Sequence, residues 1–166
     1  MIRKLTTFTR LDWRMKVNFA EAVLLPTAIW IGFKMLGVAR TQGILRSWSG
    51  RPRRIGRIAE PGMATIARAC RAQRIVKRSL GIDGSCLVRS LALWAMLRKR
   101  GIETELRVGM RKREGRVEGH AWLEFQGQAL NEAESVIATY SALPVPVTYD
   151  LWLKTFRVGS KLRSLS

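Results

Sequence analysis

The chain has 166 residues and is 47% hydrophobic, so it can form one compact domain with a real core, and a second full domain is not expected. Its 30 Lys and Arg residues against 12 Asp and Glu give a formal charge of +18, which points to an acidic peptide, an anionic membrane surface or nucleic acid as a partner. Zinc-finger spacing and an RNP-type aromatic string are both missing, so nucleic acid is the least favoured of the three.

The N-terminal segment predicts a cytoplasmic protein. Residues 1–7 run into charge instead of an apolar signal region, and the chain has only two cysteines, which fits a reducing compartment. The longest apolar stretch, 22–33, is shorter than the roughly 20 residues that span a bilayer, so we expect a buried helix there. An interfacial helix at the inner face of the membrane stays open as an alternative, because basic residues surround the stretch: Arg14, Lys16, Lys34 and Arg40.

The first half of the chain predicts three helices. Residues 10–46 read as a helix interrupted near Pro26 and Gly32, and 47–56 read as a charged linker. A second helix is expected from Pro61-Gly62 to Gly81, with one stripe formed by Met63, Ile66, Cys70, Gln73 and Val76.

Cys70 lies within that stripe, so it is interpreted as a small buried thiol. After a turn at 81–84, a third helix is expected to begin at Ser85 or Cys86. It should close at Gly101, because glycine commonly follows a helix end and the last turn is basic.

The second half of the chain changes to short extended runs. They are expected at 104–110, 116–125, 128–132 and 137–141, and a short helix is expected at 150–156. Helices followed by an antiparallel sheet predict an α+β fold. Within it, we expect a helical region over 1–58 that packs on a core formed by 59–166.

Cys86 and His120 are the candidate catalytic pair. Cys86 stands at the start of a helix, where unpaired N–H groups and the positive end of the dipole favour thiolate over thiol. His120 is the only histidine and lies in a predicted strand, where a structural role is the common alternative. A helix packed on a sheet can bring the two residues together, as an imidazole that activates a thiol requires.

The residue that orients the imidazole should come from the neighbouring strand. The turn at Gln126-Gly127 leads to Asn131 and Glu132. A two-residue loop would place Asn131 on the side of His120, whereas a three-residue loop would place Glu132 there, because side chains alternate along a strand. Both residues remain candidates on this argument.

Three sequence blocks together carry a resemblance to a known family. They are Cys86-Leu87-Val88-Arg89-Ser90-Leu91-Ala92-Leu93 with Gly101-Ile102 after it, Gly119-His120-Ala121-Trp122-Leu123-Glu124, and Leu130-Asn131-Glu132. Over about residues 60–135 the chain resembles the leader peptidases of lasso peptide biosynthesis, which have a transglutaminase-like or papain-like core. The resemblance implies a triad of Cys86, His120 and Glu132, with Glu132 where the family often has aspartate and with Asn131 in reserve.

The resemblance also implies a reaction and partners. The implied reaction is hydrolysis of the bond between leader and core of a lasso precursor, after which a separate ATP-dependent cyclase closes the ring. A separate leader-recognition domain is implied as the partner that brings the substrate, because the N-terminal helices do not resemble such a domain. Neither a cofactor nor a metal is expected, because the chain has no phosphate-binding loop and no zinc-ligand spacing.

Two other functions stay open at this stage. The same triad could pass the acyl group to an amine, as transglutaminases do, because the acceptor is chosen by the pocket and by water access. Alternatively, the chain could be a basic scaffold that binds an acidic peptide, a membrane or nucleic acid, with Cys86 and His120 purely structural.

Overall fold

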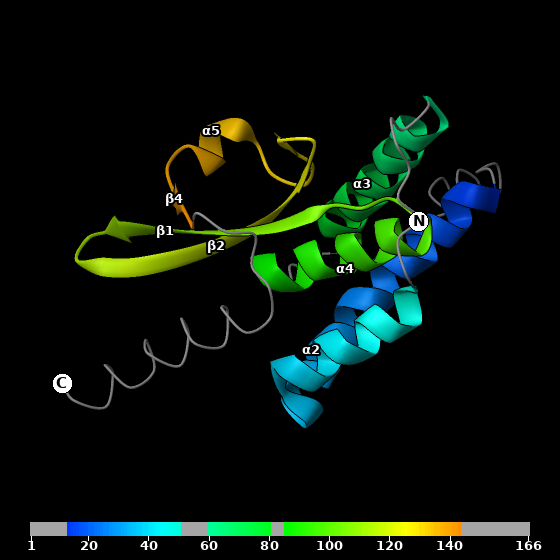
Figure 1. The fold of residues 1–166 in the computed structure, drawn as a ribbon, viewed down its shortest axis with the longest axis horizontal. Coiled ribbons are helices and arrows are strands. Elements are labelled where there is room, and N and C mark those ends of the chain that lie inside the picture. The colour runs from blue at the N-terminus through cyan, green and yellow to red at the C-terminus, as the bar shows by residue number, and fades with distance from the viewer. Residues whose placement is uncertain (1–12, 51–59, 81–84, 144–166) are drawn as a thin grey trace.

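A computed structural model describes residues 13–50, 60–80 and 85–143, and it arranges helices around one end of a twisted antiparallel sheet (Figure 1). The sheet order is β3-β2-β1-β4 and every pairing is antiparallel. The predicted α+β class is confirmed. The elements in chain order are α2 (Trp13–Ser49), α3 (Glu60–Leu80), α4 (Cys86–Lys99), β1 (Glu105–Arg113), β2 (Arg116–Phe125), β3 (Gln128–Ala129), α5 (Glu134–Ile137) and β4 (Ser141–Ala142).

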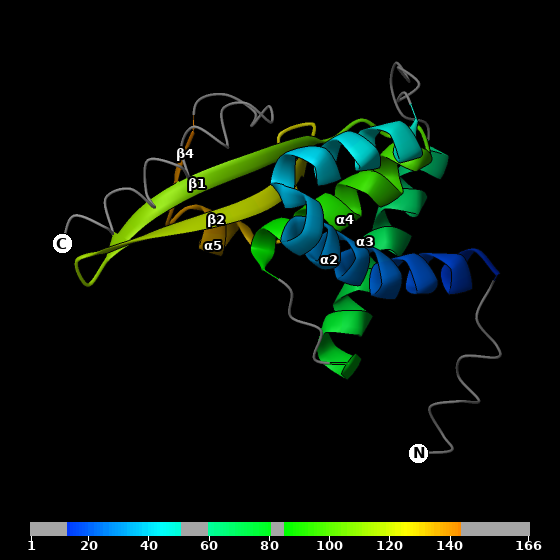
Figure 2. The ribbon, with the colours of Figure 1, turned by 90° about the horizontal axis from the view of Figure 1, so that it is seen from below.

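Helix α4 is the centre of the core. It is capped by Ser85, whose Oγ accepts from the Val88 N–H at 3.4 Å, and it ends before Gly101, whose φ of 76° suits a glycine. Most of its residues between Leu87 and Leu97 are buried. It can be buried on several sides because α2, α3 and β2 all contact it (Figure 2).

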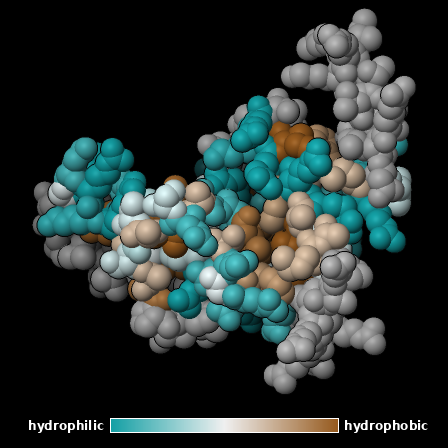
Figure 3. All heavy atoms as spheres, turned by 90° about the horizontal axis from the view of Figure 1, so that it is seen from above, coloured by the Kyte–Doolittle hydropathy of each residue, from teal (hydrophilic) through white to brown (hydrophobic). Residues whose placement is uncertain are grey.

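The β1–β2 hairpin supplies the sheet face that covers α4. Its register pairs Leu106 with Leu123 and Val108 with Ala121, so all four side chains lie on one face and all are buried. Beyond the helices the hairpin continues into a charged tip, seen as the hydrophilic region at the left of Figure 3. The sheet therefore has a buried half against α4 and an exposed half.

The break in α2 differs from the prediction. The helix passes through Pro26 and Gly32, and its only non-helical residue among those described is Gly37, with φ 78° and ψ 165°. Gly32 has another role, because a Cβ there would lie 2.8 Å from the side chain of Thr41. The two arms of α2 thus pack closely at a glycine, and the turn between them is made by the glycine that adopts a positive φ.

The apolar segment of α2 is buried on one side only. Ala22 and Ile29 are about 1% exposed, but Leu24 is 66% exposed, so the expectation of a buried helix holds for one side only. The helix is also longer than the apolar stretch alone suggested. By length and composition, Trp13–Gly37 would be sufficient to cross a membrane, and it is the one such helix among the described residues.

The connections near the sheet also needed correction. Residues 47–49 belong to α2 and not to a linker, and β3 ends at Ala129 instead of reaching residue 132. Residues 137–141 are mostly not extended, since α5 ends at Ile137 and only the two-residue β4 pairs with β1. Residues 51–56 of the predicted linker, the turn at 81–84 and the helix at 150–156 lie outside the described residues.

Candidate active site

Cys86 is the first residue of α4 and is partly buried against the core. Two N–H groups of this first turn are bound, that of Val88 by the Ser85 side chain and that of Arg89 by the Ser85 carbonyl at 3.1 Å. The N–H groups of Cys86 and Leu87 have no partner among the residues that the structure describes. The thiol therefore lies beside backbone donors and the positive end of a helix dipole, as the sequence predicted.

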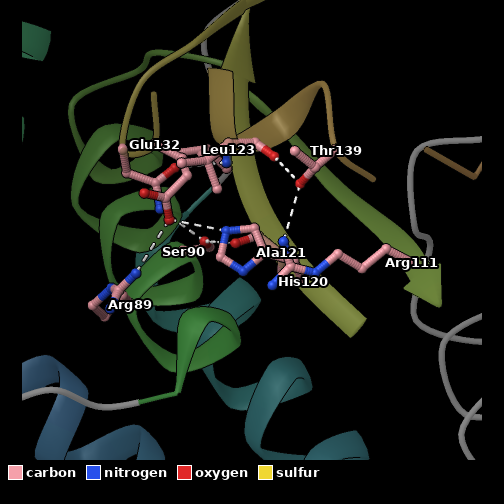
Figure 4. A network of polar contacts seen from close by, with 10 residues as sticks. Arg89, Ser90, Arg111, His120, Ala121, Leu123, Glu132 and Thr139 are labelled. Carbon is pink, nitrogen blue, oxygen red and sulfur yellow. Dashed lines mark hydrogen bonds and ion pairs between the residues drawn. The ribbon is translucent and has the colours of Figure 1, made fainter. Parts of the chain in front are cut away.

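His120 lies in β2 with its side chain 14% exposed, and one of its ring nitrogens contacts a carboxylate. Its Nε2 is 2.9 Å from Oε2 of Glu132 (Figure 4). Because a carboxylate only accepts hydrogen bonds, Nε2 must carry the proton of the neutral ring. The Nδ1 atom is then the nitrogen with a lone pair that can accept a proton from a thiol.

Glu132 also links His120 to α4. Its Oε2 lies 3.4 Å from a guanidinium nitrogen of Arg89, and the two side chains are 20% and 17% exposed. The carboxylate therefore lies between the imidazole and the guanidinium, as Figure 4 shows. The two contacts hold the carboxylate in place while it orients the ring.

Asn131 points elsewhere and has a structural role. Its Oδ1 accepts from the Leu123 N–H at 2.8 Å, and its Nδ2 donates to Ser90 Oγ at 2.9 Å. Ser90 in turn donates to the Ala121 carbonyl at 3.1 Å, and this serine is fully buried. The chain of hydrogen bonds fastens α4 to β2 next to His120 without contacting the imidazole.

The strand-parity argument failed here for an identifiable reason. The turn is the two-residue one, because Phe125 pairs with Gln128, and that register predicted Asn131 beside His120. However, the ladder stops at Ala129, and the Asn131 side chain takes the place of a backbone acceptor for Leu123. Once the strand has ended, alternation no longer holds, and Glu132 reaches His120 instead.

The first turn of α4 brings Cys86 to the same region. Arg89 and Ser90 follow it by three and four residues, so the three side chains share one side of the helix. Arg89 contacts Glu132, and Ser90 contacts the backbone next to His120. Cys86 thus lies about one helical turn, roughly 5 Å along the axis, before the two residues that join α4 to His120 and Glu132.

Two aromatic rings, which the sequence analysis did not predict as part of the site, stack on the imidazole. Tyr140 stacks on His120 with ring centres 5.0 Å apart, and Trp122 stacks at 6.3 Å. Gly109, which pairs with His120 across the sheet, makes room for them: a Cβ there would lie 2.9 Å from the Tyr140 Cβ. A glycine inside a strand often marks such a close approach, so this position carried a usable signal.

A basic cavity of about 460 Å³ adjoins the Glu132 side of the site. Four cationic side chains and one carboxylate line it, which makes it suitable for an acidic ligand group. They are Arg74, Lys77, Arg78, Arg89 and Glu132.

Cys70 lies in the wall of this cavity and is only 6% exposed. Burial raises the pKa of its thiol to about 11, although nearby Arg74 opposes the shift. The prediction that Cys70 is buried is confirmed, and at neutral pH its thiol stays protonated.

Comparison with known proteins gives one match. Residues 29–145 match the transglutaminase-like superfamily, a range that includes α3, α4, the sheet and the residues Cys86, His120 and Glu132. Neither the curated proteins nor the solved structures gave a match.

Proposed function

The chain belongs to the transglutaminase-like superfamily, and on this premise we propose that it is a cysteine peptidase that removes the leader from a lasso peptide precursor. The observation that carries the proposal is the pairing of His120 Nε2 with Glu132, one helical turn from a cysteine at a helix N-terminus. This is the arrangement in which a thiol, a base and an orienting group can act as a unit. In this proposal Cys86, His120 and Glu132 are the catalytic residues.

The first half of the reaction would proceed as acyl transfer to sulfur. The Cys86 thiolate attacks the carbonyl carbon at the end of the leader, and the negative charge that develops on the oxygen is stabilised by the N–H of Cys86. The imidazolium of His120 then gives its proton to the departing amine of the core peptide. Glu132 stabilises the charged ring throughout, and the leader remains attached to Cys86 as a thioester.

The second half restores the enzyme with water. His120 removes a proton from water as the oxygen attacks the thioester carbon, and the proton is returned to the Cys86 sulfur as the C–S bond breaks. The products are a leader with a free carboxylate and a core peptide with a free amine. That amine is what a separate cyclase requires to close a macrolactam ring.

The lasso precursor as substrate is supported by the three sequence blocks around Cys86, His120 and Glu132, and by the basic cavity that adjoins the site. Such a cavity suits acidic side chains of a leader peptide. A separate leader-recognition domain is proposed as the partner that delivers the precursor. Electrostatic binding of this kind should weaken as salt increases.

Mass spectrometry of a reaction with a lasso precursor and its leader-recognition domain tests the proposal. We expect a leader ending in a free carboxylate from the unaltered enzyme and none from Cys86→Ala or His120→Ala. Cys70→Ala is the matched control for loss of a thiol, because it leaves Cys86, His120 and Glu132 in place, and it should still cleave even though Cys70 lies in the wall of the basic cavity. Cleavage by Cys86→Ala would disprove the nucleophile assignment.

The same experiment separates the two alternatives. A product in which the acyl group is joined to an amine would identify a transglutaminase-like transferase with the same residues. Full biological output from Cys86→Ala would instead support a basic scaffold without catalysis.

A further inference from the structure

Helix α2 carries an apolar stripe on its exposed side that the catalytic proposal does not use. Trp13 is 74% exposed, Leu24 66% and Met35 78%, although each is a large hydrophobic residue. The members of the stripe recur at intervals of seven, four, four, three and four residues, which places them on one side of a helix. They are Trp13, Ala20, Leu24, Ala28, Ile31 and Met35.

The opposite side of the same helix is already used by the fold, because Ala22 and Ile29 are buried there. Glu21, the only acidic residue between positions 13 and 49, lies at the edge of the stripe, seven residues before Ala28. Its carboxylate forms ion pairs with Lys99 at 3.1 Å and Arg100 at 2.6 Å. The exposed side of α2 is therefore apolar with basic borders, and the carboxylate at its edge is neutralised by two cations.

A groove of about 580 Å³ continues the stripe at its N-terminal end, since Trp13 and Val17 line it. Three arginines, Arg14, Arg68 and Arg100, line the groove, and no acidic residue does so among those described. The charge of Arg100 is balanced by Glu21, so Arg14 and Arg68 make the groove cationic. An adjacent apolar stripe and cationic groove match the two parts of an anionic lipid, acyl chain and phosphate.

We propose that the stripe and the groove together dock the protein on the surface of an anionic lipid bilayer. Exposed tryptophans such as Trp13 and Trp30 suit the boundary between headgroups and acyl chains. Lys34, which lies 5.3 Å from the centre of the Trp30 ring, can place its charge at the phosphate level. The overall charge of +18 adds long-range attraction to such a surface.

The helix lies in the plane of the membrane surface and does not cross it. Its other side is attached to α3 and α4, and Glu21 is bound to two cations of the α4 end. A crossing helix would carry this side, with its charges, into the hydrocarbon, which is costly. Docking by the stripe leaves the attached domain in water, so the catalytic residues remain accessible to a soluble precursor.

Vesicle sedimentation of the full-length Cys86→Ala variant tests the proposal independently of peptidase activity. The probes are vesicles of phosphatidylglycerol and phosphatidylcholine in equal parts, and vesicles of phosphatidylcholine alone. We expect binding to the first set, weaker binding at high salt, and much weaker binding to the second set.

Surface substitutions locate the docking site. Replacing Leu24 and Met35 by serine should weaken binding on the order of tenfold or more, because both insert into the acyl region. Arg14→Gln should weaken it about fivefold on the anionic vesicles, as expected for one basic group near the surface. Val117→Ser is the matched control, since Val117 is 71% exposed but belongs to β2 and not to α2, and its loss should leave binding unchanged.

Three results would overturn the proposal. Unchanged vesicle binding by the Leu24 and Met35 double variant would remove the stripe from the interface. A dimer in size-exclusion chromatography that this double variant converts to a monomer would assign the stripe to a second copy of the chain. Resistance of the bound protein to alkaline carbonate extraction would indicate a membrane-crossing helix.

Discussion

Replacing Glu132 and its neighbour Asn131 separately should produce two different defects. Glu132 contacts the His120 imidazole and Arg89, whereas Asn131 contacts the Leu123 backbone and Ser90. We therefore expect Glu132→Ala to impair the chemistry with little loss of stability. Asn131→Ala should lower stability and leave the chemistry of the folded fraction almost intact.

The size of the Glu132 effect follows from its contact with His120. A hydrogen bond between charged groups contributes about 1.5–3 kcal/mol, and each 1.4 kcal/mol is a factor of ten in rate. Since the carboxylate is shared with Arg89 and is 20% exposed, Glu132→Ala should cost roughly tenfold to a hundredfold. Glu132→Asp should keep a good part of the rate, and Glu132→Gln should lie between, because an amide holds the ring but adds no charge.

We expect Asn131→Ala to lower the free energy of unfolding. It removes both side-chain hydrogen bonds and leaves the N–H of Leu123, a fully buried residue, without its acceptor. Such a loss costs about 1–3 kcal/mol, which should lower the melting temperature by roughly 3–10 °C.

Both effects can be measured without a substrate. In a Cys70→Ala background, Cys86 is the only thiol, so its rate of alkylation by iodoacetamide at neutral pH reports on the cysteine and histidine pair. Thermal unfolding followed by circular dichroism gives the stability of each variant. When a lasso precursor is used as substrate, the cleavage rate of the same variants can be measured as well.

The opposite ranking would refute the assignment. If Asn131→Ala slowed alkylation more than Glu132→Ala at equal stability, the orienting role would pass to the amide. Small and equal effects would mean that neither side chain orients His120 and that its neighbours Tyr140 and Trp122, or the backbone, hold the ring.

Four further predictions concern His120, Cys70 and Gly109. His120→Ala should reduce cleavage on the order of a thousandfold or more while circular dichroism shows an intact fold; loss of the fold would instead indicate a structural histidine. Cys70 should resist iodoacetamide at neutral pH while Cys86 reacts, because burial raises the Cys70 pKa to about 11, and faster labelling of Cys70 would contradict this. Since the raised pKa favours the folded thiol, stability should fall as the pH rises past the ordinary thiol pKa toward about 11, and Cys70→Ala should lack that part of the fall. Gly109→Ala should destabilise the fold by about 1–3 kcal/mol and slow Cys86 alkylation, because its Cβ would displace Tyr140 from His120; an unchanged melting temperature and rate would exclude this packing role.

Local sequence was sufficient for the elements that carry the chemistry. Ser85 before an apolar run and Gly101 after it predicted α4, because caps and helical periodicity act within a few residues. The extended runs expected at 104–110 and 116–125 predicted the β1–β2 hairpin for the same reason. Cys86 at a helix start and a single histidine in a strand then defined the candidate pair, whose catalytic roles stay a prediction.

Tertiary structure decided which neighbour of the hairpin reaches the imidazole. Strand parity could not predict that the Asn131 side chain would replace a backbone acceptor of Leu123. This replacement depends on Ser90 of α4, which accepts a hydrogen bond from the Asn131 amide. Packing also decided which glycine breaks α2: Gly32 is needed as a close contact with Thr41, and the turn falls at Gly37. Periodicity alone could not predict which side of α2 is exposed, because the helix is apolar on both sides. The positions of α3 and α4 determine which side is covered.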